Sequence, residues 1–148
     1  MNDDLYYMAE ALSEACLAAE IDEVPIGAII VRDGNIIARA HNLRETEKNA
    51  LYHAETLAID RACRALGGWR LPGCTLYVTL EPCPMCAGAI VNSRIERVVF
   101  GAYDKRAGAF GSVLNLNEYP LNHKPEILGG VMEEECRSLL QTFFKKKR

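Results

Sequence analysis

Two short motifs carry the residue types that zinc chemistry needs. The first is His53-Ala54-Glu55, and the second is Pro82-Cys83-Pro84-Met85-Cys86. Cys83 and Cys86 are three positions apart, so in the first turn of a helix their side chains share one face. The unpaired N–H groups of a helix N-terminus also favour thiolate over thiol. Two thiolates and one imidazole are therefore three good ligands for a zinc ion.

Three protein ligands leave one coordination position open, which is typical of a catalytic zinc site. Water in such a position loses a proton near neutral pH and becomes a nucleophile. Glu55 is then the natural proton carrier, because it can accept that proton and return it to the substrate and the leaving amine. This role requires His53 and Glu55 to lie together in the very first turn of a helix, which the spacing alone does not establish.

Two other interpretations of the cysteine pair remain open at this point. A Cys-x-x-Cys pair is also found in redox sites and as half of a structural zinc site. A structural site needs a fourth ligand, and the candidates are Cys16, Cys63, Cys74, Cys136, His41 and His123. Cys16, Cys63 and Cys136 fall within helical patterns, and we expect them to be core residues. The combination of both motifs, each beside an expected helix start, favours the catalytic zinc.

The elements that must position these motifs alternate between strands and helices. Helices are expected at residues 4–19, with Asp3 or Asp4 as cap, from His53 to the Gly67-Gly68 stop, at 85–93 and at 133–144. Strands are expected at 26–31, 36–40, 75–80, 97–101 and 126–128. Asp33-Gly34 joins the first two strands as a hairpin, and residues 41–52 form a loop. This order predicts a single layered α/β domain over residues 1–148 with a partly parallel sheet.

Composition and charge limit the classes of protein to consider. The chain has 148 residues, 49% of them hydrophobic, but no apolar run of the ~20 residues that a membrane-spanning helix needs. The acidic N-terminus does not resemble a secretion signal, so we expect a cytoplasmic protein with reduced cysteines. Seven acidic residues and no Lys or Arg occupy residues 1–31, while Lys145–Arg148 are all basic. This asymmetry is compatible with RNA binding on one side, although a solvated acidic helix explains it equally simply.

The two motifs match the H-x-E…P-C-x-x-C signature of zinc deaminases. The chain resembles the cytidine/deoxycytidylate deaminase superfamily, and within it most closely the bacterial tRNA-specific adenosine deaminases. The resemblance covers nearly the whole chain from about Glu23, and the segments that carry it are residues 23–28, 76–83, 85–90, 93–95, 97–102, 111–112 and 122–123. The sequence departs from the family pattern at Ala50-Leu51-Tyr52, just before His53, and at Tyr103.

The resemblance implies a fold, a ligand set and a substrate site. The implied fold is a three-layer α/β/α domain, cytidine-deaminase-like, with a central mixed five-stranded sheet. His53, Cys83 and Cys86 match the ligands of one Zn²⁺ per chain, and Glu55 matches the proton shuttle. Asn42 matches the asparagine that contacts the flipped base, Asp104 matches a contact to the anticodon loop, and Arg106 falls where a basic loop residue is common. The family is a homodimer with its RNA site near the dimer interface.

The function implied by the resemblance is hydrolytic deamination of adenosine to inosine at the wobble position of a tRNA anticodon stem-loop. The main alternative is deamination of free guanine or of a nucleotide such as deoxycytidylate. A zinc-stabilised RNA-binding module without catalysis is a third hypothesis. Glu55 argues against this last one, because a structural zinc site has no use for a carboxylate there.

Overall fold

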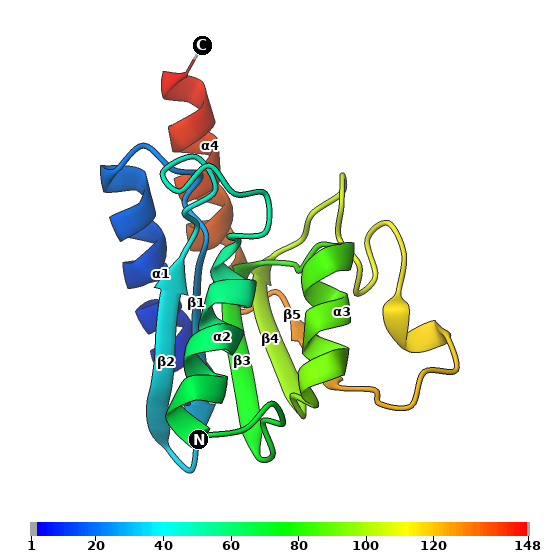
Figure 1. Cartoon of the computed structure of the whole chain (residues 1–148). Coiled ribbons are helices and arrows are strands. Elements are labelled where there is room, and N and C mark those ends of the chain that lie inside the picture. Colours follow the sequence, from blue (N-terminus) through cyan, green and yellow to red (C-terminus); the bar gives the residue numbers. More distant parts are fainter. Residues whose placement is uncertain (1–2, 148) are drawn as a thin grey trace.

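The computed structural model describes residues 3–147, which contain one mixed five-stranded sheet in the order β2-β1-β3-β4-β5. Figure 1 shows the sheet between two layers of helices. The strands are β1 (Gly27–Arg32), β2 (Asn35–His41), β3 (Cys74–Leu80), β4 (Arg97–Ala102) and β5 (Glu126–Gly129). β1 runs antiparallel to β2 and β3, whereas β3, β4 and β5 run parallel to one another. The expected partly parallel sheet of five strands is confirmed.

Four helices cover the two faces of this sheet. They are α1 (Asp3–Glu20), α2 (Ala54–Leu66), α3 (Pro84–Ser93) and α4 (Glu133–Lys146). The core on the α2 and α3 face contains Ala58 and Ile90 packed with Ile30 and Val98 of the sheet. The core on the α1 and α4 face contains Met8 and Cys136 together with neighbouring sheet residues such as Ile29, Tyr77 and Val99. Side chains alternate across the strands and so supply both cores, which makes the domain the expected three-layer α/β/α structure.

Turn chemistry explains where several elements begin and end. Asp33 and Gly34 both have positive φ, 52° and 77°, as a tight two-residue hairpin between β1 and β2 requires. α2 ends at Gly67, which adopts the left-handed conformation with φ of 76° and bonds back to the carbonyl of Cys63. Pro84 occupies the first turn of α3. A backbone N–H has no partner within the helix at this position, so proline, which lacks one, is tolerated there.

Two expectations about individual residues need correction, and one short element was not expected. Asp3 and Asp4 lie inside the first turn of α1 instead of capping it, and the Asp4 carboxylate accepts hydrogen bonds from Tyr77 and Arg97. Cys16 is exposed, because it falls on the outer face of α1. A short 3₁₀ helix, η1 (Leu116–Glu118), was not expected from the sequence.

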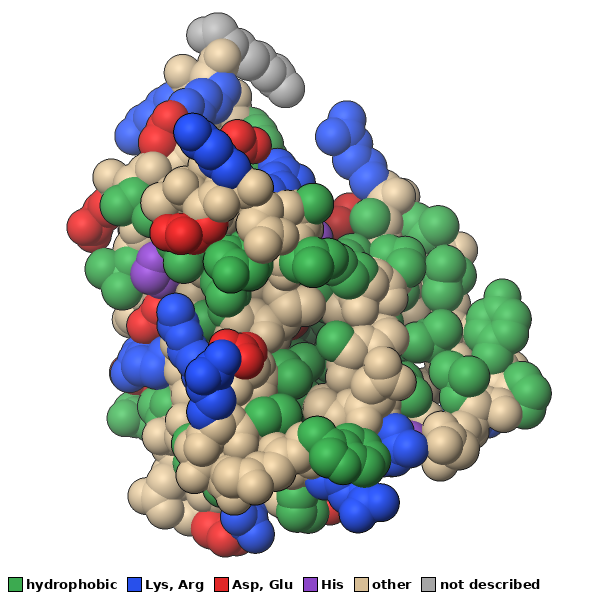
Figure 2. Space-filling view, viewed as in Figure 1, with side chains coloured by type: hydrophobic (Ala, Val, Ile, Leu, Met, Phe, Trp, Pro, Cys, Tyr) green, Lys and Arg blue, Asp and Glu red, His purple; other side chains and the backbone are tan. Residues whose placement is uncertain are grey.

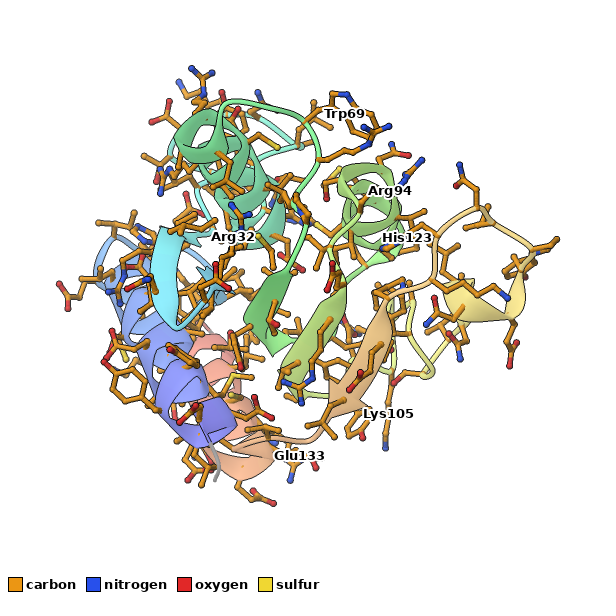
Figure 3. The ribbon with its side chains drawn as sticks, turned by 90° about the horizontal axis from the view of Figure 1, so that it is seen from below. Arg32, Trp69, Arg94, Lys105, His123 and Glu133 are labelled. Atoms are coloured by element: carbon orange, nitrogen blue, oxygen red, sulfur yellow. The ribbon has the colours of Figure 1, made fainter. Side chains whose placement is uncertain are left out.

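An exposed tryptophan lies near the N-terminal end of β3, at the opposite end of the sheet from the C-terminal ends of β3 and β4. Trp69 lies just after α2, and the guanidinium groups of Arg70 and Arg94 lie 4.5 Å and 5.6 Å from its ring centroid. Figure 3 shows Trp69 beside Arg94 at this end. No helix within residues 3–147 is both long and apolar enough to cross a membrane.

Candidate metal centre and substrate pocket

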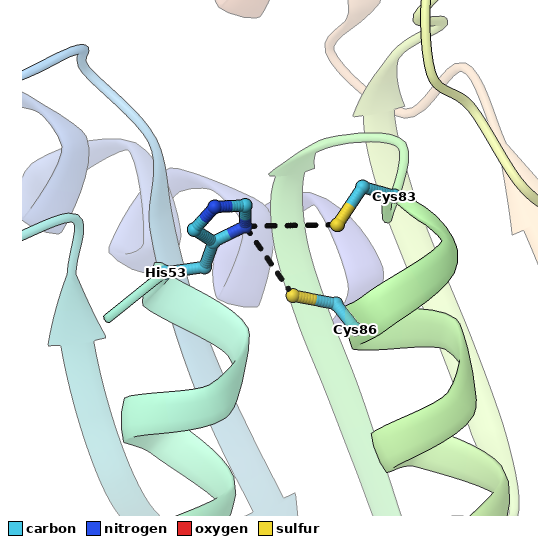
Figure 4. A group of neighbouring side chains, drawn as sticks. All are labelled: His53, Cys83 and Cys86. Atoms are coloured by element: carbon cyan, nitrogen blue, oxygen red, sulfur yellow. Dashed lines mark hydrogen bonds between the residues drawn. The ribbon is translucent and has the colours of Figure 1, made fainter. Parts of the chain in front are cut away.

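His53, Cys83 and Cys86 meet where the N-termini of α2 and α3 lie side by side (Figure 4). His53 is the N-cap residue of α2, and Cys83 is the N-cap residue of α3. Cys86 is buried in the first turn of α3. Pro82 and Pro84 stop β3 from continuing and start α3 at once, so both sulfur atoms face the imidazole across the gap between the helices.

The distances between the three ligand atoms fit a tetrahedral zinc ion. His53 Nδ1 lies 3.6 Å from Cys83 Sγ and 3.5 Å from Cys86 Sγ. A tetrahedral ion with Zn–N of about 2.0–2.1 Å and Zn–S of about 2.3 Å would hold such a pair of atoms roughly 3.6 Å apart. Because the ligand atoms of all three side chains lie within 4.8 Å of one another, they are placed to share one zinc ion.

A structural site with a fourth side-chain ligand is not supported by the geometry. Among residues 3–147, these three are the only cluster of at least three His, Cys, Asp or Glu side chains close enough to share a metal. The other candidates are occupied elsewhere: His41 contacts Glu14, and His123 contacts the carbonyl of Ile95. Cys74 and Cys136 are buried in the two cores. The cluster thus offers three ligands and leaves one position for a small molecule.

The two thiols have opposite protonation preferences. A hydrogen bond from the Cys86 thiol lowers the pKa of Cys83 to about 4, and the bond from His53 adds to this effect. The shared proton then stays on Cys86, whose pKa is raised above that of a free thiol, and burial raises it further. Cys83 is therefore ready to bind a metal as a thiolate, and a cation would take the place of the proton held by Cys86.

Glu55 is the second residue of α2 and is 4% exposed. Burial raises the pKa of its carboxyl group to about 7, although a hydrogen bond from its own backbone N–H and the charge of His53 oppose this shift. A carboxyl group with a pKa near neutrality both accepts and returns a proton readily. His53 and Glu55 thus share the first turn of one helix, which is the arrangement that the proton-carrier hypothesis required.

A pocket of about 390 Å³ opens beside His53, near the C-terminal ends of strands β3 and β4. Asn42, Asp104 and Arg106, three residues singled out from the sequence, all line it. Asn42 Oδ1 accepts a hydrogen bond from the N–H of Arg44, and Asp104 Oδ1 accepts one from the N–H of Arg106. Both residues therefore shape the turns of their loops in addition to lining the pocket.

The sequence did not indicate that α4 contributes to this pocket. Leu140 and Phe144 of α4 line it and also line an adjoining cavity of about 720 Å³. This second cavity shares Arg106 with the first and adds the basic side chains Arg137, Lys145 and Lys147. The aromatic Phe144 directly before a basic run was the available signal, but helical periodicity alone assigned it to a closing helix. Together the two cavities form a continuous surface of aromatic, apolar and basic groups leading to His53.

Comparisons with known proteins point to one group of enzymes. The family model of the MafB19-like deaminases matches residues 2–148. A tRNA-specific adenosine deaminase of Bacillus subtilis is 59% identical over the whole of this chain and 92% of its own length. A solved structure from a study of A-to-I editing by tRNA:A34 deaminases at the wobble position of transfer RNA has a TM-score of 0.89 at 46% identity, covering 91% of this chain and 99% of that one. A guanine deaminase of Bacillus subtilis is more distant, with a TM-score of 0.65 at 31% identity over 82% of this chain and 88% of that one.

Proposed function

This chain belongs to the family of tRNA-specific adenosine deaminases, and we propose that it converts the wobble adenosine of a tRNA anticodon to inosine. The reaction consumes one water and releases ammonia from C6 of the adenine. The observation that carries the proposal is the pairing of a three-ligand cluster at zinc spacing with a buried Glu55, beside a pocket lined by Asn42 and Asp104. The full-length similarity to tRNA-specific adenosine deaminases supports the same substrate.

In this proposal His53, Cys83 and Cys86 hold one Zn²⁺ per chain. When bound, the ion supplies the Lewis acidity that activates water at neutral pH. Glu55 accepts one proton of that water and passes it to the adenine ring, and it then moves a second proton, from the hydroxyl group added at C6, to the departing amine. Its burial beside the ligand cluster keeps it out of bulk solvent, so the proton moves between Glu55 and the substrate instead of being lost to water.

The remaining pocket residues recognise the RNA. Asn42 contacts the extruded base, while Asp104 and Arg106 hold neighbouring nucleotides. A base in a hairpin loop is already partly unstacked, so moving it into a pocket costs less free energy than taking it from a duplex. The basic side chains along α4 support phosphate contacts, and binding through phosphates weakens as salt concentration rises.

We also propose that residues 1–148 act as one deaminase domain and that two copies form a homodimer. Gly88 and Ala89 are small, half-buried residues on the outer face of α3, which permits close approach of another helix. Figure 2 shows hydrophobic side chains gathered over α3 and the loop after β4, where Val113, Tyr119 and Leu121 are exposed. The substrate places the enzyme in the cytoplasm, where tRNA is available.

A deaminase assay tests the proposed function directly. An anticodon stem-loop with adenosine at the wobble position is compared with free guanine and deoxycytidylate as substrates. Guanine belongs in this comparison because of the similarity to guanine deaminase. We expect turnover of the stem-loop and little conversion of either small molecule.

A further inference from the structure

A buried carboxylate next to the metal ligands has no part in the mechanism above. Glu81 directly follows β3, precedes Cys83 by two positions, and is 1% exposed. Its Oε1 accepts hydrogen bonds from the N–H of Asp104 at 3.0 Å and from the hydroxyl of Ser112. Its Oε2 accepts the N–H groups of Phe110 and Ser112, each at 3.1 Å. All four donors come from the loop that follows β4.

The loop is built around this carboxylate. A buried carboxylate is tolerated only when hydrogen bonds replace its lost hydration, and four donors do so here. Gly108 packs so closely on Glu81 that a Cβ atom at this position would overlap the carboxylate. The N–H of Ala109 also donates a hydrogen bond to the carbonyl of Pro82 at 2.9 Å. The backbone of the loop is therefore bonded directly to the backbone of the segment that carries Cys83.

The same loop forms one wall of the substrate pocket. Asp104, Arg106 and Ala107 line the pocket beside His53, whereas the exposed Lys105 lies between them on the outside (Figure 3). Asp104 connects this wall of the pocket to Glu81. Its N–H is held by Glu81, and its carboxylate accepts the N–H groups of Arg106 at 3.0 Å and Ala107 at 3.3 Å. The position of Arg106 therefore depends on Asp104, which in turn depends on Glu81.

We propose that Glu81 is a positioning residue that holds residues 104–112 in the form that binds RNA. It fixes the pocket wall to the segment that carries Cys83, and through Asp104 it sets substrate affinity. This inference rests on the proposed function, because the affinity in question is that for the anticodon loop.

Glu81→Gln is the sharpest test, because an amide keeps the shape and changes only one acceptor into a donor. If the new NH₂ group occupied the Oε2 position, it would face two backbone N–H donors, those of Phe110 and Ser112. At the Oε1 position it faces the N–H of Asp104 and the Ser112 hydroxyl, which can turn and accept. The second orientation leaves fewer groups unpaired, so the damage is expected at Asp104.

We expect Glu81→Gln to raise the KM for an anticodon stem-loop about ten- to hundredfold, as an unpaired buried N–H allows. Zinc content stays at that of the wild type, and kcat at saturating RNA changes less than about threefold, because only substrate binding is weakened. Ser112→Ala removes the hydroxyl donor but leaves the backbone donors in place, and it serves as the mild control. Asp4→Asn removes a carboxylate charge at the other end of the sheet and controls for loss of stability alone.

A double-mutant cycle with Asp104→Ala tests the route through Asp104. If Glu81 acts through this residue, adding Glu81→Gln to Asp104→Ala raises the KM little further. The inference is overturned by additive effects, by an unchanged KM, by loss of zinc as the main effect, or by an equal KM increase in Asp4→Asn.

Faster amide hydrogen exchange of residues 104–112 in Glu81→Gln is expected as well, and this measurement needs no RNA. Absence of wild-type turnover on the stem-loop would instead refute the proposed function, while the exchange measurement would still report on Glu81.

Discussion

At the scale of single residues, one helix turn holds both a proposed metal ligand and the proposed proton carrier. His53 is the cap of α2 and Glu55 is its second residue, so the turn brings both groups to the same small volume. Burial then gives the Glu55 carboxyl group a pKa of about 7, in the range where a proton can be both accepted and released. The ordinary pKa of a glutamate would make it a poor donor at neutral pH.

This division of roles predicts that Glu55→Ala and Glu55→Gln keep zinc and fold but lose turnover. Removing a positioned acid and base typically lowers the rate by about 10²–10⁴, and two proton transfers depend on this group, so the loss is expected at or above that range. Turnover on a stem-loop and zinc content by elemental analysis check this. Near-normal turnover in either variant would assign the proton transfers to another group.

The clustering of the three proposed ligands could be predicted from the sequence, but the shape of the pocket could not. The spacing of Cys83 and Cys86, with proline before and between them, restricts both to one helix start. Asn42 comes from the loop after β2, whereas Asp104 and Arg106 come from the loop after β4, and only the resemblance to a family placed these two distant loops in one site. Phe144 and Leu140 were missed because their helical spacing is the same whether a helix faces a core or a pocket.

At the scale of elements, the proposed metal site joins the N-termini of α2 and α3. We expect Cys83→Ser and Cys86→Ser to lose zinc and some thermal stability, because metal binding contributes to folding when its ligands join separate elements. Cys16→Ser is the matched control, since Cys16 is an exposed thiol on α1. Elemental analysis and thermal unfolding check the three variants. Full zinc content in both ligand variants would contradict the assignment.

A second link joins α1 to the middle of the sheet. The Asp4 carboxylate accepts two hydrogen bonds from Arg97, at 2.9 and 2.8 Å, and one from Tyr77 at 2.6 Å. The hydrogen bonds from Arg97 lower the pKa of Asp4, and the bond from Tyr77 lowers it further, although burial opposes the shift. A lowered pKa means that this link stabilises the fold above the pKa of the unfolded chain and is lost as pH falls through the folded value.

Asp4→Asn is therefore expected to lower the free energy of unfolding by about 1–3 kcal/mol at pH 7, the range for hydrogen bonds to charged groups. The difference from the wild type should begin to shrink as the pH falls below about 4, the ordinary pKa of an aspartate, and it should be lost once the pH passes the lowered pKa of the folded protein. Urea unfolding at pH 7, 5 and 3 measures it. An equal difference at all three values would show that charge plays no part.

The strands and helices themselves followed well from local patterns. Asp33-Gly34 forms the turn between β1 and β2, and Gly67 ends α2. Both positions need a positive φ, which few residue types adopt readily, so the sequence located these two boundaries accurately. The strand order β2-β1-β3-β4-β5 depends on which non-local partners pair, and no local pattern contains that information. The 3₁₀ helix at Leu116–Glu118 was missed, because three residues are too few to show a period.

At the scale of the whole molecule, the surface divides into regions of different charge and hydrophobicity. Acidic side chains of α1 are partly taken up by ion pairs, since Glu10 and Glu14 both contact Arg39. Arg106 and Lys145 line the cavity along α4 together with Arg137 and Lys147, which pair with Glu133 and Asp22. We expect this surface to bind RNA although the chain has a net charge of −3. The resemblance to a homodimeric family and the small residues of α3 together favour self-association through the α3 face.

We therefore expect a homodimer at micromolar concentration. Sedimentation of the wild type should give twice the mass of one chain, 16.4 kDa. Gly88→Arg adds a large charged side chain at a position with open space around it, so the monomer should fold normally while the dimer dissociates. Asn92→Arg near the end of α3 adds the same charge and is the control for charge alone. A wild-type protein that sediments only as a monomer would contradict the proposed assembly.

The most direct measurement is turnover on an anticodon stem-loop with adenosine at the wobble position, alongside free guanine and deoxycytidylate at matched concentrations. The account predicts inosine formation from the stem-loop, with little conversion of the small molecules, because they lack the neighbouring nucleotides that supply binding free energy. A stem-loop with cytidine in place of the adenosine should not react, and Glu55→Gln should abolish the signal. Faster conversion of guanine or deoxycytidylate, or equal reaction of the cytidine stem-loop, would contradict the assignment of a tRNA adenosine substrate.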